Sequence, residues 1–194
     1  LRRSGLESQL SQDTLEVLNQ FLKLRLQWNR THNLMGPKAA REPWQIDVCD
    51  GIALSKLCQG PLPLFDVGSG SGVPGLLFGI LVPDVEVILV EPLAKRAAFL
   101  KTAIHKLGVT NARVIRSRWP IQDLPRCEVV SRAVASPETW PALANQGMMI
   151  QGIYRYLALK RPPFTETDFC LKGQCDYQRG SSEALRLEHW VRKG

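Results

Sequence analysis

The segment Asp66-Val67-Gly68-Ser69-Gly70-Ser71-Gly72-Val73-Pro74-Gly75 begins at the end of a short apolar run, residues 64–67. Such a run is typical of a buried parallel strand. Glycines at the end of the first strand of an α/β domain let the backbone approach a ligand that side chains would otherwise block. A helix over residues 74–81 would open directly after the loop. This stretch therefore predicts a strand, a ligand-binding turn and a helix in succession.

An acidic residue ends the next predicted strand, residues 85–90. It is Glu91, and a carboxylate at this place can accept two hydrogen bonds from a ribose diol. Dinucleotide binding fits less well, because its fingerprint needs a third glycine three residues after the second. Here Gly72 comes two residues after Gly70, and Gly75 comes five after it. The alternative without a ligand is a structural tight turn beside a surface glutamate.

Strand and helix patterns alternate beyond this point. A helix is predicted over residues 94–107, strands over 113–115 and 128–133, and a further helix opened by Ser136-Pro137. The fifth strand has two candidates, residues 156–160 and 169–172. Alternation of this kind predicts an α/β fold with a doubly wound parallel sheet.

The chain before the first strand has helical rather than strand periodicity. Residues 11–29 form an amphipathic helix for which Asp13 and Glu16 suggest a capped start, and residues 44–58 form a second helix. We therefore expect an N-terminal helical cap over residues 1–60 and a ligand-binding domain over residues 61–194.

Composition places the chain among globular proteins with an anionic partner. The 194 residues are 44% hydrophobic, which is enough for one sizeable core. No run of eighteen apolar residues occurs and the N-terminus lacks the pattern of a signal peptide, so we expect a cytoplasmic protein without a membrane span. The net charge of +7 favours a polyanion such as nucleic acid.

The five cysteines are odd in number and irregularly spaced. Cys170 and Cys175 have no second cysteine pair and no nearby histidine, so reduced thiols are favoured over a zinc site. No metal is expected.

Four stretches resemble a known bacterial family in order and spacing. They are Trp28-Asn29-Arg30-Thr31-His32-Asn33-Leu34, the glycine loop with its Val73-Pro74-Gly75 tail, Leu93-Ala94-Lys95-Arg96 with Phe99-Leu100, and Ser131-Arg132-Ala133-Val134-Ala135-Ser136. The chain resembles the glucose-inhibited division protein B family, which methylates N7 of a guanine in small-subunit (16S) ribosomal RNA. The resemblance implies a Rossmann-like class I methyltransferase sheet with helices on both faces. It also implies S-adenosyl-L-methionine as cofactor and ribosomal RNA or the 30S subunit as partner.

The resemblance also implies a set of site residues. Gly68 and Val73 match loop positions that contact the cofactor, and Trp119-Pro120 falls where the family has its adenine-contacting pair. Arg132 matches the arginine that closes the pocket near the transferred methyl, and it is the candidate catalytic residue. The expected cofactor-binding set is Gly68, Gly70, Gly72, Val73, Glu91, Trp119, Pro120 and Arg132.

Several positions depart from the family pattern. Pro120 replaces an acidic residue, and Ile46-Asp47 replaces an Arg-His pair that lies toward the RNA side, with Asp50 retained. The family lysine after the fifth strand matches either Lys160 or Lys172. The C-terminus is short for the family's last hairpin, so we expect that part of the fold to be reduced.

The predicted chemistry needs no general base, because N7 of guanine already has an in-plane lone pair. Catalysis would rest on positioning. We expect the three histidines to be structural or solvent-facing. A rim of basic side chains would contact RNA phosphates; it comprises Lys95, Arg96, Lys101, Lys106, Arg113, Arg116, Arg118 and Arg126. Two alternatives remain: a methyltransferase with another substrate, and a degenerate relative that binds ribosomal RNA without catalysis. A monomer is expected.

Overall fold

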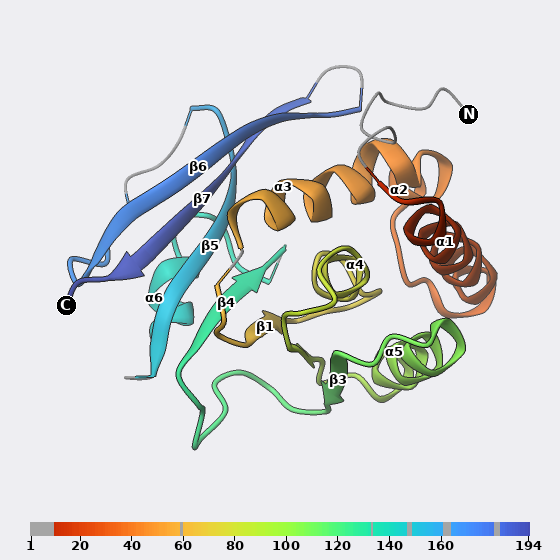
Figure 1. Ribbon diagram of the computed structural model, residues 1–194, viewed down its shortest axis with the longest axis horizontal. Coiled ribbons are helices and arrows are strands. Elements are labelled where there is room, and N and C mark those ends of the chain that lie inside the picture. Colours follow the sequence, from red (N-terminus) through yellow and green to blue (C-terminus); the bar gives the residue numbers. More distant parts are fainter. Residues whose placement is uncertain (1–9, 59, 133, 147–148, 161–163, 181–182) are drawn as a thin grey trace.

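The computed structural model describes residues 10–58, 60–132, 134–146, 149–160, 164–180 and 183–194. In these residues one mixed sheet of seven strands runs through the molecule in the order β3-β2-β1-β4-β5-β7-β6 (Figure 1). The strands are β1 (Leu64–Val67), β2 (Val87–Val90), β3 (Ala112–Ile115), β4 (Cys127–Ser131), β5 (Ile150–Ala158), β6 (Phe169–Arg179) and β7 (Glu183–Arg192). β1 to β5 pair in parallel, whereas β7 is antiparallel to both β5 and β6.

The central strands are buried on both faces. All four residues of β1 and all four of β2 are buried. Because successive side chains point to opposite faces, the two strands feed two separate apolar clusters. Leu64, Val87 and Leu89 belong to one cluster, while Phe65 and Ile88 belong to the other.

Helices cover both faces of the sheet, and they are distributed unequally (Figure 1). They are α1 (Gln12–His32), α2 (Pro37–Arg41), a π-helical turn η2 (Trp44–Val48), α3 (Cys49–Leu57), α4 (Gly75–Leu81), α5 (Ala94–Leu107) and α6 (Trp140–Ala144). Buried residues of α1, α3, α4 and α5 share the first cluster, and α6 packs in the second. In the described residues, the connection from β3 to β4 contains no helix.

The first turns of two helices differ from the sequence prediction. α1 begins at Gln12, close to the predicted start at residue 11, but its cap is Ser11, whose hydroxyl accepts the Thr14 N–H at 3.2 Å, so the cap predicted at Asp13 is wrong. The helix predicted from Ser136-Pro137 begins only at Trp140. The reason is that the N–H groups of Thr139 and Trp140 first bond back to the Ser136 carbonyl and form a separate turn.

The C-terminal part of the fold is larger than predicted. The fifth strand, β5, takes in residues 156–158 of the first candidate, whereas the second candidate opens β6. β6 and β7 have 11 and 10 residues and pair along their length, so the predicted reduced hairpin is wrong. Lys160 lies just beyond β5 and Lys172 lies within β6. Ala133, predicted as the end of a strand, lies outside the described residues.

Helix α1 packs against the rest of the fold through its apolar face. Leu18, Phe21 and Leu22 are buried in the same cluster as Leu76 of α4 and Leu100 of α5. None of the described helices is both long and apolar enough to cross a membrane.

Candidate functional site

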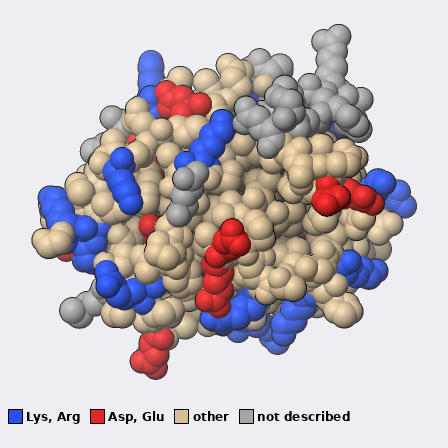
Figure 2. Space-filling view, in the orientation of Figure 1, with Lys and Arg blue, Asp and Glu red and all other residues tan. Residues whose placement is uncertain are grey.

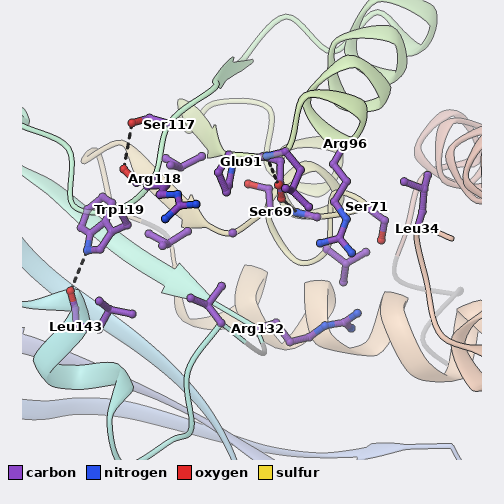
Figure 3. A pocket seen from close by; sticks show the side chains of 18 residues that line it. Leu34, Ser69, Ser71, Glu91, Arg96, Ser117, Arg118, Trp119, Arg132 and Leu143 are labelled. Carbon is purple, nitrogen blue, oxygen red and sulfur yellow. Dashed lines mark hydrogen bonds between the residues drawn. The ribbon is translucent and has the colours of Figure 1, made fainter. Parts of the chain in front are cut away.

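A cavity of about 740 Å³ opens at the carboxyl ends of the central parallel strands. Its walls are Leu34, Val67, Gly68, Ser69, Gly70, Ser71, Val73, Val90, Glu91, Pro92, Leu93, Arg96, Ser117, Arg118, Trp119, Arg132, Val134 and Leu143 (Figure 3). The strand order reverses at β1, because the chain moves from β1 outward to β2 and β3 and then returns to β4 on the other side. Open α/β sheets bind ligands at this kind of switch point.

The glycine loop forms the floor of this cavity. Gly68 and Gly70 have φ angles of +72° and +54°, which L side chains rarely adopt. A Cβ atom on Gly68 would lie 2.1 Å from Cγ2 of Val134. At Gly70 the nearest atom to such a Cβ is 3.7 Å away, so the space in front of this backbone is open. Both positions therefore present bare backbone to the cavity.

Two residues of the predicted set do not line the cavity. Gly72 faces the protein interior, where a Cβ atom would lie 3.0 to 3.2 Å from Phe21, Leu76 and Leu100. A glycine is needed at this position because side chains of α1, α4 and α5 pack against it. Pro120 is exposed and lies off the cavity wall, although the adjacent Trp119 is part of it. The other six predicted residues are brought together on the wall.

Glu91 braces the glycine loop. Its Oε2 accepts the Gly70 N–H at 2.9 Å, and its Oε1 accepts the Leu93 N–H at 2.8 Å. The side chain is only 2% exposed. Since an ionised carboxylate has about four acceptor positions, both oxygens keep one for a ligand hydroxyl. Glu91 thus shapes the loop as well as lining the cavity.

Asp66 lies below the loop at the end of β1. Its Oδ2 accepts the Gly75 N–H at 3.0 Å, whereas its buried Oδ1 has no partner among the described residues. Desolvation raises the pKa of Asp66 to about 7, against the opposing effect of the Gly75 N–H. A Cβ on Gly75 would lie 2.5 Å from the Asp66 side chain, so only glycine permits this approach.

Trp119 forms the wall on the side of the second apolar cluster. Its ring packs 6.4 Å from the ring of Phe65, and its Nε1–H donates to the Leu143 carbonyl at 2.8 Å. These contacts fix the orientation of a large flat surface beside the cavity (Figure 3). A surface of this kind suits stacking of a heteroaromatic ring.

Arg132 belongs to a buried network of alternating charges. Its Nη1 donates to Asp47 Oδ1 and to Asp50 Oδ2, both at 2.7 Å. Asp47 Oδ2 also accepts from Arg25 Nη1 at 2.9 Å, and Arg25 Nη2 donates to the hydroxyl of Ser71 in the glycine loop. The network therefore connects α1, η2, α3, the loop and the segment after β4.

Burial tends to lower the pKa of both arginines, and their neighbours decide the direction of the net shift. Desolvation lowers the pKa of Arg25, which is fully buried, and Asp47 opposes that shift. For Arg132 desolvation is outweighed by Asp47 and Asp50, which together raise its pKa. Arg132 is therefore a fixed cation with a 22% exposed side chain at the cavity.

No sequence pattern used above predicts this network. The family resemblance implied that Ile46 and Asp47 lie toward the RNA, but they are 7% and 0% exposed, so that expectation is wrong. The available signal was the spacing of Arg25, which falls seven residues after Leu18 on the buried face of α1. A charged residue on an apolar face needs a buried counter-charge.

The predicted basic rim divides into two groups. Arg96 from α5 and Arg118 from the segment after β3 line the cavity, with Arg132 on its opposite side near α3 (Figure 3). Arg113 is instead paired with Glu86 on the surface at 3.0 Å. Figure 2 shows other lysines and arginines spread around this face rather than gathered in one block.

The remaining candidates lie away from the cavity. His189 is buried beside Glu128, with its Nε2 3.1 Å from Oε1, whereas His32 and His105 are exposed. Trp28 packs edge-on against Phe99 at 5.4 Å. The five cysteines are free thiols, and the described residues contain no group of three side chains placed to hold a metal.

Solved structures show the same fold at low sequence identity. M. capricolum TrmK bound to S-adenosyl-homocysteine is 12% identical with a TM-score of 0.54, covering 82% of this chain and 70% of that one. P. horikoshii TYW2 in complex with MeSAdo is 15% identical with a TM-score of 0.55, covering 82% and 65%. These likenesses show that the chain has a Rossmann-like fold.

Sequence relatives are closer. Ribosomal RNA small subunit methyltransferase G of Wolinella succinogenes is 36% identical over 132 residues, which is 68% of each chain. The protein of the same name from Chromobacterium violaceum is 30% identical over 156 residues, 78% of this chain and 73% of that one. For Desulfitobacterium hafniense the match covers only 49% of the relative.

The match extends to the family as a whole. The profile described as rRNA small subunit methyltransferase G matches residues 14–168, which include the glycine loop, Glu91, Trp119 and Arg132. The chain belongs to the rRNA small subunit methyltransferase G family.

Proposed function

We propose that this chain is an S-adenosyl-L-methionine-dependent methyltransferase that methylates N7 of a guanine in small-subunit (16S) ribosomal RNA. One observation carries the proposal. This chain, which belongs to the family, has a cavity at the switch point of its sheet, with bare glycine backbone as its floor and Glu91 at its border.

The cavity fits the cofactor in size and chemistry. Its volume of about 740 Å³ lies within the range of sites for small organic ligands. Gly68 and Gly70 would hold the cofactor by close backbone approach, and Glu91 would accept from its ribose hydroxyls. Trp119 would pack against its adenine. When bound, S-adenosyl-L-methionine supplies a methyl group on a sulfonium sulfur.

The residues of this chain contribute positioning rather than proton transfer. N7 of guanine attacks through an existing lone pair, so no side chain needs to accept a proton. Arg132 is held in place by Asp47 and Asp50, and such a preorganised cation costs little reorganisation during reaction. It would orient the acceptor beside the methyl group.

The substrate side of the proposal rests on charge and family membership. Arg96 and Arg118 at the cavity would contact phosphates near the target nucleotide. We propose that residues 1–60 act as a cap on the cofactor-binding part, residues 61–194, and that the protein works as a cytoplasmic monomer on ribosomal RNA or the 30S subunit.

The first test is calorimetric titration with S-adenosyl-L-methionine and with S-adenosylhomocysteine. We expect a micromolar Kd, about −8 kcal/mol, that is lost in Gly70→Arg. Gly108→Arg is the matched control, because Gly108 also has a positive φ but has open space around it and does not line the cavity. No binding of either compound to the folded wild-type chain would support the degenerate RNA-binding alternative.

The second test is transfer of a tritiated methyl group to small subunits that lack the modification. The expected result is that the label is found at a guanine and at no other position of the RNA. Cofactor binding without transfer to this RNA would point to a methyltransferase with another substrate.

A further inference from the structure

A second cavity, of about 290 Å³, lies on the other side of Arg132. Arg132 lines both cavities, and the second one also opens at the carboxyl ends of β4 and β5. Its walls are Ser131, Arg132, Ala135, Pro137, Trp140, Arg155, Tyr156, Leu157, Ala158, Arg179, Glu183 and Leu185. Apart from Arg132, none of these wall residues belongs to the predicted site set.

The arginines of this wall are already paired. Arg132 donates to two aspartates, Arg155 Nη2 donates to Glu188 at 2.7 Å, and Arg179 forms a two-bond pair with Glu183 at 2.7 and 3.1 Å. Because their charges are compensated, the cavity is not built to bind a phosphate. The rest of the wall is mostly apolar or aromatic, including Tyr156 and Leu185. A neutral, flat and partly polar ligand suits these walls.

The paired charges form a continuous chain along the cavity. Asp50 Oδ2 accepts from Arg132 Nη1 at 2.7 Å and lies 3.5 Å from Arg179 Nη1, and Arg179 in turn holds Glu183. Arg132 therefore lies at one end of this row of charges, next to the first cavity, and Glu183 lies at the other end. Tyr177 donates to Asp50 Oδ1 at 2.6 Å and secures the middle.

We propose that this second cavity receives the base of the target guanine, with O6 toward Arg132, so that the N7 lone pair stays free for the methyl group, and with the N1–N2 edge toward Glu183. The proposal rests on the proposed function. Guanine carries N–H donors at N1 and N2, and a carboxylate accepts from both, whereas adenine has an acceptor at N1 and no amino group at N2. Among the described residues of the wall, Glu183 has the one carboxylate. Arg179 uses one acceptor position on each oxygen, and Lys38 Nζ lies 3.7 Å from Oε2; the remaining positions are open to the base.

Methyl transfer to N7 in this orientation conserves electrons and charge. The N7 lone pair forms the new N–C bond while the C–S bond breaks, and the bonding electron pair remains on sulfur. One positive charge moves from sulfur to the purine, and no proton changes place in this step. The methyl group must then pass from the first cavity to the second beside Arg132, the side chain that they share.

The direct test fills the cavity without touching the first one. Ala158 is exposed, lines only the second cavity of the two, and pairs in register with Leu185. We expect Ala158→Trp to bind S-adenosyl-L-methionine with a Kd within twofold of wild type while methyl transfer falls at least 100-fold. Ala184→Trp is the matched control, because Ala184 is also exposed but points to the opposite face of β7; it should keep wild-type transfer.

A second variant tests the orientation of the base. Glu183→Gln replaces two acceptors by one acceptor and one donor, so kcat/KM for the RNA should fall by about 10- to 100-fold with unchanged cofactor Kd. Transfer by Ala158→Trp above a third of the wild-type rate would overturn the assignment of the cavity. Unchanged kcat/KM in Glu183→Gln would overturn the orientation. If the wild-type chain binds cofactor but transfers no methyl to this RNA, the proposed function fails first, and this inference fails with it.

Discussion

Asp47 joins two arginines through its two carboxylate oxygens: Oδ1 accepts from Arg132 at 2.7 Å and Oδ2 accepts from Arg25 at 2.9 Å. Asp47 has no exposed surface, and Arg25 has none either. Since Arg25 also bonds Ser71, the glycine loop and the arginine of the cavity are positioned by one buried carboxylate. The N-terminal helices thus take part in building the site and do not merely cover it.

Asp47→Asn should destabilise the fold and weaken methyl transfer. An amide offers a neutral oxygen to one arginine and a donor to the other, which leaves a buried guanidinium uncompensated. Breaking a buried pair in this way costs about 3 to 5 kcal/mol, measurable by urea unfolding. Glu86→Gln, which breaks the exposed pair with Arg113, should cost about 1 kcal/mol or less. Equal effects of the two substitutions would contradict the role assigned to Asp47.

Gly72→Ala and Gly70→Ala should separate packing from binding. At Gly72, with φ at +85°, the added methyl meets Phe21, Leu76 and Leu100 at 3.0 to 3.2 Å, so we expect a loss of about 2 to 3 kcal/mol in stability. Cofactor affinity of the folded fraction should change little. At Gly70 the stability loss should be about 1 kcal/mol, with a larger loss of affinity, because the methyl enters the cavity. Unfolding curves and calorimetry at low temperature measure the two effects, and the opposite ranking of affinities would count against this assignment.

Asp66 should give the stability of the fold a distinctive pH dependence. Burial raises its pKa from 3.8 to about 7, so between these values the folded chain keeps a proton that the unfolded chain has released. Stability from this group is therefore greatest below pH 3.8, falls as the pH rises, and levels off above about 7. Relative to Asp66→Asn, the wild-type unfolding free energy should decline by about 1 kcal/mol per pH unit between pH 5 and 6.5. A difference that stays constant over this range would show that Asp66 ionises normally.

Glu91→Gln should weaken cofactor binding by about tenfold or more. The amide has one oxygen, so either the Gly70 or the Leu93 N–H loses its acceptor, at a cost of about 1 to 3 kcal/mol. The proposed contacts to the ribose hydroxyls are weakened at the same time. Titration with S-adenosylhomocysteine measures the Kd, and Glu86→Gln serves again as the surface control. An unchanged Kd would mean that Glu91 only braces the loop.

Local sequence patterns were enough to predict the elements around the site. The apolar residues 64–67, the glycine segment and Glu91 were placed at the carboxyl ends of β1 and β2, where the structure has them. Hydrophobic periodicity, turn residues and strand length are local properties of the sequence, and they were enough to predict the parallel strands of the sheet. The cap of α1 and the start of α6 at Trp140 were less well predicted, because hydrogen bonds of single side chains and turns decide them.

For the predicted cofactor residues, too, sequence alone did not decide which ones line the cavity. Gly68, Gly70 and Gly72 are equivalent in the sequence, yet the first two face the cavity and the third packs against α1. Trp119 and Pro120 are neighbours, and only Trp119 reaches the wall. The direction in which each residue points depends on what lies next to it in space.

The sequence by itself determined that the chain has an α/β sheet with a glycine loop and an acidic residue at the next strand end, because these features need only short stretches of chain. It also carried the resemblance that indicated the family. Tertiary structure alone decided that Asp47 meets Arg25 and Arg132, 22 and 85 residues away along the chain. It likewise decided that a second cavity forms beside Arg132. The first feature arises where α1, η2 and the end of β4 meet, and the second where the ends of β4 and β5 meet β6 and β7. The folding of distant segments against one another sets both groups of contacts.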